Sequence, residues 1–132
     1  MSKVLIVDDH LAFRRGLHLM LEEITEVTEI EECETGLQFL DQFEESAPDL
    51  VFMDIRMPGI SGIEAAAKAL NQNPDLRIIV LTMFGEEKYL KDAMEAGVMG
   101  FITKPPSLLQ LKEAYQTVMQ NAPFFPSELK TW

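Results

Sequence analysis

Four short apolar runs recur along this chain of 132 residues, and a stretch with helical periodicity follows each of them. Continuous apolar runs rich in β-branched residues are typical of parallel strands that are buried on both faces. Strands that alternate with helices predict right-handed βα units and a parallel sheet covered by helices on both sides. A fifth, weaker strand is predicted where a density of glutamates suits the edge of a sheet. The sequence thus predicts one doubly wound α/β domain with strands at 4–7, 26–33, 50–53, 78–81 and 98–103.

Apolar stripes and capping residues place a helix after each predicted strand. In the first helix, Phe13 and Leu17 belong to the apolar stripe and Arg14 lies off it. The third helix is predicted to turn inward a face made of Ile63, Ala66, Ala67 and Leu70. The five helices are predicted over about 10–24, 35–46, 61–72, 86–96 and 107–120, and three of them begin with the capping residues Thr35, Ser61 and Ser107.

Composition excludes several classes of function. The formal charge is −11, from 22 acidic and 11 basic residues, whereas binding to duplex DNA requires a surplus of lysine and arginine. The domain is therefore not expected to bind nucleic acid directly. The single cysteine, Cys33, excludes an intrachain disulfide and a cysteine metal cluster. The apolar run that ends at Asp8 is too short for a signal peptide or a membrane span, which predicts a cytoplasmic protein without membrane contact.

Polar residues stand where four of the predicted strands end: Asp8 and Asp9, Asp54, Thr82 and Lys104. The carboxyl ends of parallel strands share one edge of the sheet, where ligands bind in open α/β folds. Carboxylates that meet there repel one another by on the order of 4 kcal/mol per pair, at 4 Å and an effective dielectric constant of about 20. A hard divalent cation such as Mg²⁺ offsets this repulsion. The sequence therefore predicts a magnesium site at this edge.

The same residues favour phosphoryl transfer. A carboxylate beside Mg²⁺, with a lysine and a hydroxyl to stabilise the transferred group, is able to attack phosphorus and form an aspartyl phosphate. Each residue taken alone also has an ordinary structural interpretation. Asp8 or Asp9 is a good helix cap, Asp54 is a turn residue, and Lys104 is a solvated side chain. That interpretation requires all of them to coincide on one edge.

Four separated motifs resemble those of the response-regulator receiver domain, the CheY-like phosphoacceptor of two-component signalling. The resemblance covers about residues 3–120 and implies a flavodoxin-like fold with strand order 2-1-3-4-5. His10, Arg14 and Gly16-Leu17 are most similar to the NarL-type subfamily, whose members usually carry a C-terminal helix-turn-helix DNA-binding domain. The motifs are Leu5-Ile6-Val7-Asp8-Asp9-His10, Met53-Asp54-Ile55-Arg56-Met57-Pro58-Gly59, Leu81-Thr82 and Phe101-Ile102-Thr103-Lys104-Pro105.

The resemblance implies roles for the residues at the strand ends. Asp54 is the expected phosphoacceptor, and Thr82 and Lys104 are expected to hold the phosphoryl oxygens. Phe101 matches a switch aromatic that turns inward when Thr82 moves toward the phosphate. The Lys104–Pro105 peptide bond is expected to be cis.

The resemblance also implies a metal cofactor, Mg²⁺ or Mn²⁺. Asp9 and Asp54 are expected to bind it directly, together with the backbone carbonyl of Arg56. Asp8 is expected to act mostly through metal-bound water.

Domain limits and partners follow from the same resemblance. Residues 1–120 are expected to form the receiver domain and 121–132 a tail or the start of an interdomain linker, with no helix-turn-helix segment among the 132 residues. The expected donor is a sensor histidine kinase, and phosphorylation is expected to drive homodimerisation and control transcription through an attached domain. Such a domain is not a classical enzyme, although it promotes its own phosphorylation and slow dephosphorylation. Met83 and Phe84 differ from the residues of many receivers and leave the phosphate lifetime open.

Other functions fit the residues less well. A flavin-binding relative needs a Ser/Thr/Gly-rich loop where Asp8-Asp9-His10 stands, and a dinucleotide enzyme needs an absent G-x-G-x-x-G motif. A magnesium phosphohydrolase usually carries its nucleophile after the first strand, whereas the lone Asp54 follows the third. A degenerate receiver, acting without phosphorylation, usually lacks an acidic, Thr or Lys position that is present here. His10 and His18 have no partners at metal-ligand spacing, so no catalytic role is expected of them.

Overall fold

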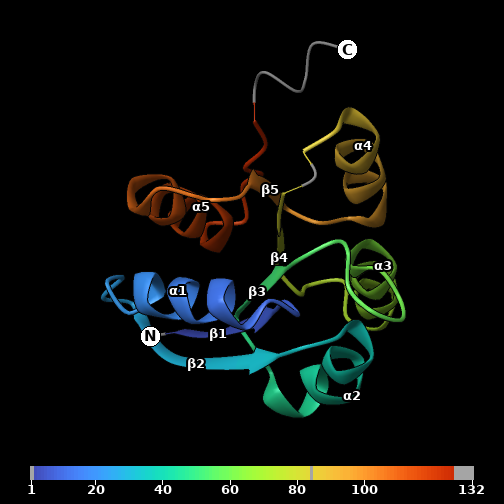
Figure 1. Ribbon diagram of the computed structural model, residues 1–132, viewed down its shortest axis with the longest axis horizontal. Helices are drawn as coiled ribbons and strands as arrows, with labels where there is room; N and C mark the ends of the chain where they lie inside the picture. The colour runs from blue at the N-terminus through green and yellow to red at the C-terminus, as the bar shows by residue number, and fades with distance from the viewer. Residues whose placement is uncertain (1, 84, 127–132) are drawn as a thin grey trace.

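The computed structural model describes residues 2–83 and 85–126. Strands and helices alternate throughout, so all five predicted βα units are present (Figure 1). Within the described ranges, no helix is both long and apolar enough to cross a membrane. The strands are β1 (Ser2–Val7), β2 (Val27–Cys33), β3 (Leu50–Met53), β4 (Ile78–Thr82) and β5 (Gly100–Thr103), and the helices are α1 (Leu11–Leu21), α2 (Gly36–Ser46), α3 (Gly62–Gln72), α4 (Glu87–Ala96) and α5 (Leu108–Met119).

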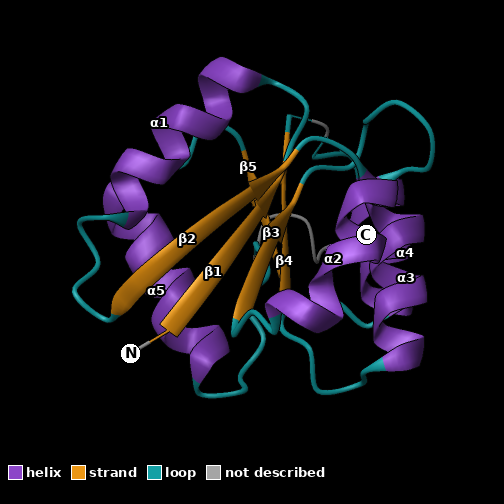
Figure 2. Ribbon diagram, turned by 90° about the horizontal axis from the view of Figure 1, so that it is seen from below, coloured by secondary structure: helices purple, strands orange, loops and turns teal. Residues whose placement is uncertain are grey.

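Every pair of neighbouring strands is parallel, in the order β2-β1-β3-β4-β5. The predicted doubly wound fold with strand order 2-1-3-4-5 is therefore confirmed. Helices α1 and α5 cover one face of the sheet, and α2, α3 and α4 cover the other (Figure 2). The central strands have helices on both faces, which explains why they are almost wholly apolar.

An apolar cluster on each face of the sheet forms the core. The cluster beneath α1 and α5 includes Leu17, Leu111 and Tyr115. The cluster beneath the other three helices includes Phe39 and Phe43, whose rings stack with centroids 5.2 Å apart. Because both faces of the sheet are packed, the ends of its strands are held in fixed relative positions.

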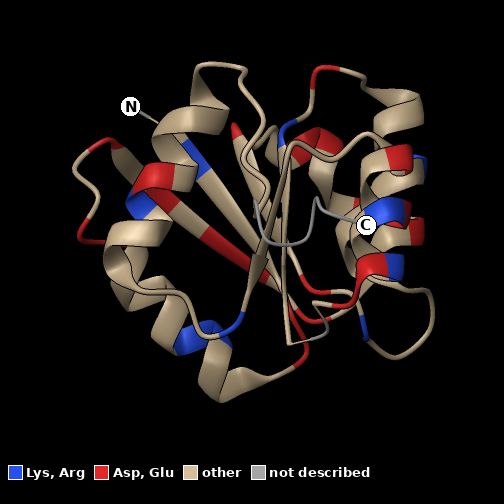
Figure 3. Cartoon of the chain, turned by 90° about the horizontal axis from the view of Figure 1, so that it is seen from above, with Lys and Arg blue, Asp and Glu red and all other residues tan. Residues whose placement is uncertain are grey.

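Strand β2 forms one edge of the sheet, as its glutamates predict. Nζ of Lys3, on the adjacent strand β1, lies 3.6 Å from Oε2 of Glu29 and 3.2 Å from Oε2 of Glu31. Partly exposed pairs of this kind contribute little to stability, so the charges act mainly to discourage pairing with another strand. Acidic residues (red) also occur on helices and loops on several sides of the molecule, so the negative charge is not confined to this edge (Figure 3).

The buried face of α3 differs from the predicted one. Ala66 is fully buried as predicted, and Ile63 and Leu70 are partly buried and pack against the core. Ala65 and Ala69, which were not predicted, are also fully buried, whereas Ala67 is exposed. The reason is the close approach of the helix to the sheet. A Cβ atom added to Gly62, the first residue of α3, would lie 1.7 Å from a main-chain oxygen of the β3–α3 loop. Only small side chains fit beneath a helix packed this closely.

After α5 the chain returns to the edge of the sheet opposite β2. The N–H of Phe124 donates to the carbonyl of Met99 at 2.8 Å, and the N–H of Phe101 donates to the carbonyl of Phe124 at 3.0 Å. These bonds form an isolated parallel bridge with Gly100. The tail up to residue 126 thus lies beside β5, while 127–132 of the expected linker fall outside the described residues.

Candidate functional site

The carboxyl ends of β1 and β3 lie side by side. Val7 and Met53 are register partners, and Asp8 and Asp54 follow them directly. The N–H of Asp54 donates to the carbonyl of Val7 at 2.9 Å, which ties the two strand ends together. Both aspartates are buried, with exposed fractions of 2% for Asp8 and 3% for Asp54. The parallel topology therefore brings two of the predicted site residues into one buried cluster.

Lys104, which follows β5, reaches both carboxylates. Its Nζ lies 2.6 Å from Oδ2 of Asp8 and 3.3 Å from Oδ2 of Asp54. The same ammonium lies 4.1 Å from the centroid of the Phe13 ring on α1. The Lys104 side chain is only 5% exposed, so the three charged groups form a buried ion cluster. Removing the ammonium from this cluster would leave its two carboxylates without compensation.

Asp9 and His10 extend the cluster at this edge. One ligand atom from each of Asp8, Asp9, His10 and Asp54 lies within 4.8 Å of the others. Nδ1 of His10 lies 3.2 Å from Oδ1 of Asp8 and 3.3 Å from Oδ1 of Asp9. His10, for which the sequence spacing indicates no metal-ligand partners, thus lies within reach of three carboxylates, and the expectation that it has no catalytic role stays a prediction. Nδ1 of His10 also lies 3.9 Å from Oδ2 of Asp54, which follows a different strand. A contact between the ends of two separate strands cannot be read from a local sequence pattern.

This donor set fits a hard divalent cation. Oδ1 of Asp9 is buried and makes no hydrogen bond among the described residues, and Nδ1 of His10 at 3.3 Å is an ion-pair contact only, so this oxygen can still bind a metal. Three carboxylates against the one ammonium of Lys104 leave two negative charges, which a divalent ion neutralises. Oxygen donors of this kind suit Mg²⁺ or Mn²⁺. Arg56 is an exposed residue of the loop after β3, and the role of its carbonyl as a ligand stays a prediction.

The environment of Asp54 raises the pKa of its carboxyl group. Burial is the largest cause and the charge of Asp8 adds to it, while Lys104 and the N–H of Ile55, 2.8 Å from Oδ1, oppose the shift. Because the pKa of the folded state exceeds that of the unfolded state, ionisation of Asp54 opposes folding. The contribution of this residue to stability is full below its ordinary pKa of 3.8 and is lost as the pH rises through the folded value.

We therefore expect Asp54→Asn to stabilise the metal-free domain at pH 7. Asparagine cannot ionise, so the variant avoids both the cost of burying the charge and the repulsion from Asp8. A gain of about 1 kcal/mol would raise the melting temperature by roughly 3–6 °C. Urea unfolding in EDTA between pH 7 and pH 4 measures the difference in the free energy of unfolding between the variant and the wild type. This difference should shrink as the pH falls.

Asp41→Asn is the matched control, because it removes one negative charge from an exposed position on α2. It is expected to change the stability by less than about 0.5 kcal/mol. An equal gain in both variants would attribute the effect to net charge and contradict the buried cluster as its cause.

Thr82 and Phe101 lie on the neighbouring strands β4 and β5. Thr82 ends β4 and is fully buried, and Phe101 on β5 is 1% exposed and packs into the core beneath α2, α3 and α4. The Lys104–Pro105 peptide bond is cis, as the resemblance implies. The switch roles of Thr82 and Phe101 stay predictions.

Two residues thought to depart from the receiver pattern follow Thr82. Met83 is 68% exposed, and Phe84 lies outside the described residues. Their effect on the lifetime of a phosphoryl group stays a prediction.

Arg14 lies buried beside the site, although the sequence pattern did not predict it there. It was expected off the apolar stripe of α1, but it is 6% exposed and lies on the same buried face as Leu17 and Leu21. Its Nη1 donates to the carbonyl of Asp8 at 2.6 Å. The spacing of 14, 17 and 21 matches one helix face, and this was the only signal in the sequence that could have revealed its burial.

Comparison with known proteins agrees with the fold. The strand order and the acidic cluster at the carboxyl edge define a CheY-like α/β domain. Residues 4–116 match the response regulator receiver domain family. The chain therefore belongs to this family of two-component signalling domains.

Individual relatives are bacterial regulators. The chain is 33% identical to the response regulator GacA of Pseudomonas syringae pv. syringae over 129 residues, covering 98% of this chain and 60% of the relative. It thus spans less than two thirds of the length of that relative. A LuxR-family two-component response regulator from Aurantimonas superimposes with a TM-score of 0.92 at 25% identity, covering 98% of this chain and 93% of the other. A further similar structure is the isolated receiver domain of RcsB from Salmonella enterica serovar Typhimurium, solved in the presence of the phosphomimetic BeF₃⁻. It superimposes with a TM-score of 0.88 at 25% identity, covering 98% of this chain and 96% of the other.

Proposed function

We propose that this receiver domain accepts a phosphoryl group on Asp54 from the phosphohistidine of a sensor histidine kinase. The observation that carries the proposal is the buried Asp54 carboxylate, whose Oδ2 lies 3.3 Å from Nζ of Lys104 beside Asp8 and Asp9. A carboxylate nucleophile needs cationic groups next to it to stabilise the charge on the transferred phosphoryl group. The phosphomimetic used with the similar RcsB domain supports the same assignment.

Transfer forms a bond between a carboxylate oxygen of Asp54 and phosphorus. The bond between phosphorus and the histidine nitrogen of the donor breaks, and its electron pair stays on the imidazole. Lys104, already between two carboxylates, pairs with an oxygen of the phosphoryl group, and the hydroxyl of Thr82 donates to another. Apart from this transfer the domain is not expected to act as a classical enzyme, and slow self-dephosphorylation is the only other reaction expected.

Mg²⁺ or Mn²⁺ would be held by Asp8, Asp9 and Asp54, with the carbonyl of Arg56 as a further ligand. When bound, the metal neutralises charge on the transferring group. The unsatisfied oxygen of Asp9 and the net charge of the cluster support this assignment.

The output is proposed to be control of association and transcription. Phosphorylation would draw Thr82 toward the phosphoryl group and hold Phe101 inward, which biases a two-state equilibrium toward a homodimer. With a net charge of −11, this domain would not bind DNA itself and would act in the cytoplasm through an attached helix-turn-helix domain. We place the receiver domain at 1–120 and a tail or linker at 121–132; the family match over 4–116 supports this division.

The first test is intact mass after incubation with Mg²⁺ and acetyl phosphate. The wild-type chain is expected to gain one phosphoryl group, and the gain should be absent in Asp54→Asn and after addition of EDTA. Light scattering on the same samples is expected to show more dimer only where the phosphoryl group is present.

Two outcomes would contradict parts of this proposal. No mass gain in the wild-type chain would indicate an interaction module that acts without phosphorylation. A mass gain without any change in association would leave the acceptor role intact and contradict the proposed output.

A further inference from the structure

A buried arginine lies directly behind the acidic cluster and is not one of its members. Arg14 comes from the inward face of α1, and its side chain is 7% exposed. Its Nη1 donates to the main-chain carbonyl of Asp8 at 2.6 Å. A buried guanidinium is costly unless its donors are paired, so the direction of each N–H is informative.

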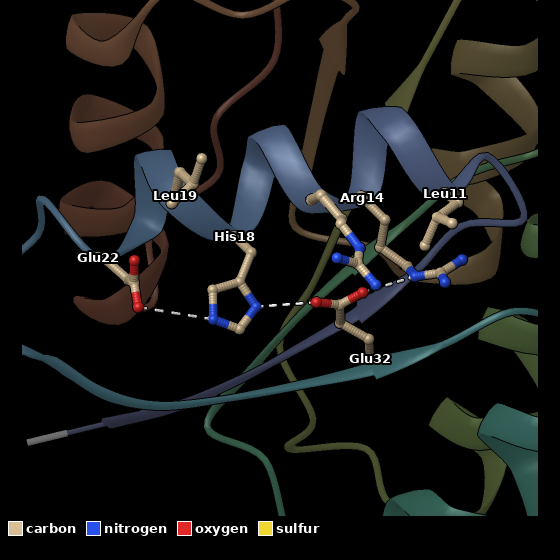
Figure 4. Close-up of a pocket in the computed structure, with 7 residues that line it drawn as sticks. Leu11, Arg14, His18, Leu19, Glu22 and Glu32 are labelled. Carbon is tan, nitrogen blue, oxygen red and sulfur yellow. Dashed lines mark hydrogen bonds and ion pairs between the residues drawn. The ribbon is translucent and has the colours of Figure 1, made fainter.

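Glu32 of β2 holds the other side of this guanidinium. Oε1 of Glu32 accepts from Nε of Arg14 at 2.7 Å, and Oε2 lies 2.8 Å from Nδ1 of His18 (Figure 4). Burial by itself would raise the pKa of the Glu32 carboxyl, but its hydrogen bonds to Arg14 and His18 outweigh burial and lower the pKa. The ionised carboxylate of Glu32 thus holds Arg14 next to the edge strand β2, and His18, a second residue of α1, holds the other oxygen of this carboxylate.

The main chain of Asp8 is consequently fixed on both sides. Its N–H donates to the carbonyl of Cys33 at 3.0 Å, and its carbonyl accepts from Arg14. The carbonyl of Asp8 and the N–H of Asp9 belong to one planar peptide unit. A bond to that carbonyl therefore sets the direction in which Asp9 leaves the strand. Asp9 is also the residue whose Oδ1 is buried without a hydrogen-bond partner among the described residues.

We propose that Arg14 is a positioning residue that holds the Asp8–Asp9 peptide in the orientation in which both carboxylates face Asp54. Glu32 in turn holds Arg14. Arg14 does not touch the reacting atoms and acts through the geometry of the two acidic ligands. This inference rests on the proposed function, because it concerns the affinity of the same site for Mg²⁺.

Two possible roles of Arg14, as a nearby charge and as a positioning group, predict opposite changes in Mg²⁺ affinity when the residue is replaced. By charge alone, a cation next to a metal site weakens Mg²⁺ binding, so removing it would tighten binding. If Arg14 positions the ligands, removing it weakens Mg²⁺ binding, because the ligand carboxylates lose their fixed arrangement. The sign of the change in affinity therefore separates the two roles, and a purely structural role would lower the melting temperature without moving the Mg²⁺ affinity.

The experiment is a Mg²⁺ titration of the full chain, followed by amide NMR or calorimetry, on wild type, Arg14→Met and Arg15→Met. Arg15→Met is the matched control, since it removes the same charge from the next residue of α1, which is exposed. We expect Arg14→Met to weaken Mg²⁺ binding about 10-fold or more, and Arg15→Met to leave it unchanged or slightly tighter. Unchanged or tighter binding in a folded Arg14→Met variant would overturn the proposal.

Arg14→Lys provides a second test if Arg14→Met does not fold. It keeps the charge, but one ammonium cannot reproduce the two directed bonds to Asp8 and Glu32. We expect Mg²⁺ to bind about threefold more weakly or worse. An affinity equal to that of the wild type would overturn the positioning role.

Phosphorylation by acetyl phosphate at increasing Mg²⁺ distinguishes this inference from the proposed function. For Arg14→Met, half-maximal rate should require more Mg²⁺, while the rate at saturating Mg²⁺ stays close to that of the wild type. A wild-type chain that binds Mg²⁺ but is not phosphorylated would contradict the proposed function and leave the Mg²⁺ result for Arg14 standing. A phosphorylated wild type with unchanged Mg²⁺ affinity in Arg14→Met would contradict the inference alone, and a wild type that binds no Mg²⁺ would overturn both.

Discussion

Replacing Gly62 with alanine is expected to cost about 3 kcal/mol or more of the free energy of unfolding and to disrupt the site. A Cβ atom at this position would lie 1.7 Å from the carbonyl oxygen of Asp54 and 2.8 Å from Cγ of Met53. The N–H of Gly62 also donates to the carbonyl of Ile55 at 2.7 Å, so the start of α3 is tied to this loop. The obstacle is main chain, which cannot rotate away, so either α3 or the loop that carries Asp54 must move.

Urea unfolding and phosphorylation by acetyl phosphate measure the two consequences. Gly16→Ala is the matched control, because nothing lies within 4 Å of a Cβ atom at that position of α1. The free energy of unfolding of this control is expected to rise by about 0.5–1 kcal/mol, since alanine is a better helix former than glycine. Wild-type stability and phosphorylation in Gly62→Ala would show that the close approach of α3 is not required.

Replacing Lys104 with methionine is expected to have the second large effect. Methionine retains an apolar contact with Phe13 but leaves the carboxylates of Asp8 and Asp54 buried without their cation. Removal of one partner from a buried ion pair typically costs about 3–5 kcal/mol, and a carboxylate that takes up a proton reduces this loss. The variant should therefore be much less stable in EDTA, and saturating Mg²⁺ should recover more stability than it adds to the wild type.

Urea unfolding with EDTA and with Mg²⁺ tests this expectation. Lys91→Met is the control, because it removes the same charge from an exposed position on α4. Phosphorylation of Lys104→Met should also be strongly slowed even at saturating Mg²⁺, since the group that pairs with the phosphoryl oxygens is lost. Equal losses of stability in the two variants would contradict the buried cluster.

Most of the fold could be predicted from the sequence because its signals are local. Each apolar run is short, continuous and bounded by polar residues, and each helix is placed by a stripe or by a cap such as Ser61, whose hydroxyl accepts from the N–H of Glu64 at 3.1 Å. Parallel topology then places all strand ends on one edge. The meeting of Asp8, Asp54 and Lys104 follows from these facts without any knowledge of side-chain contacts.

The inward face of α3 was predicted only in part, for a physical reason: Ala67 is exposed, and the buried Ala65 and Ala69 were not predicted. Alanine gives almost no signal of which way it faces, so Ile63 and Leu70 dominated the expected stripe. The actual face was set by the distance between helix and sheet, which depends on the contact of Gly62 with the main chain of Asp54. That contact exists only once β3, its loop and α3 are packed together.

What the sequence by itself determined is the order of the elements, the topology of the sheet and the acidic character of its carboxyl edge. Only the tertiary structure decided that Arg14 is buried and bonded to Asp8, that Glu32 holds it from the edge strand, and that His10 lies among the aspartates. The physical reason is the range of the interactions. Periodicity and capping act between near neighbours in the chain, whereas Arg14 meets Glu32 and His10 meets Asp54 only where the packed sheet brings separate strands together.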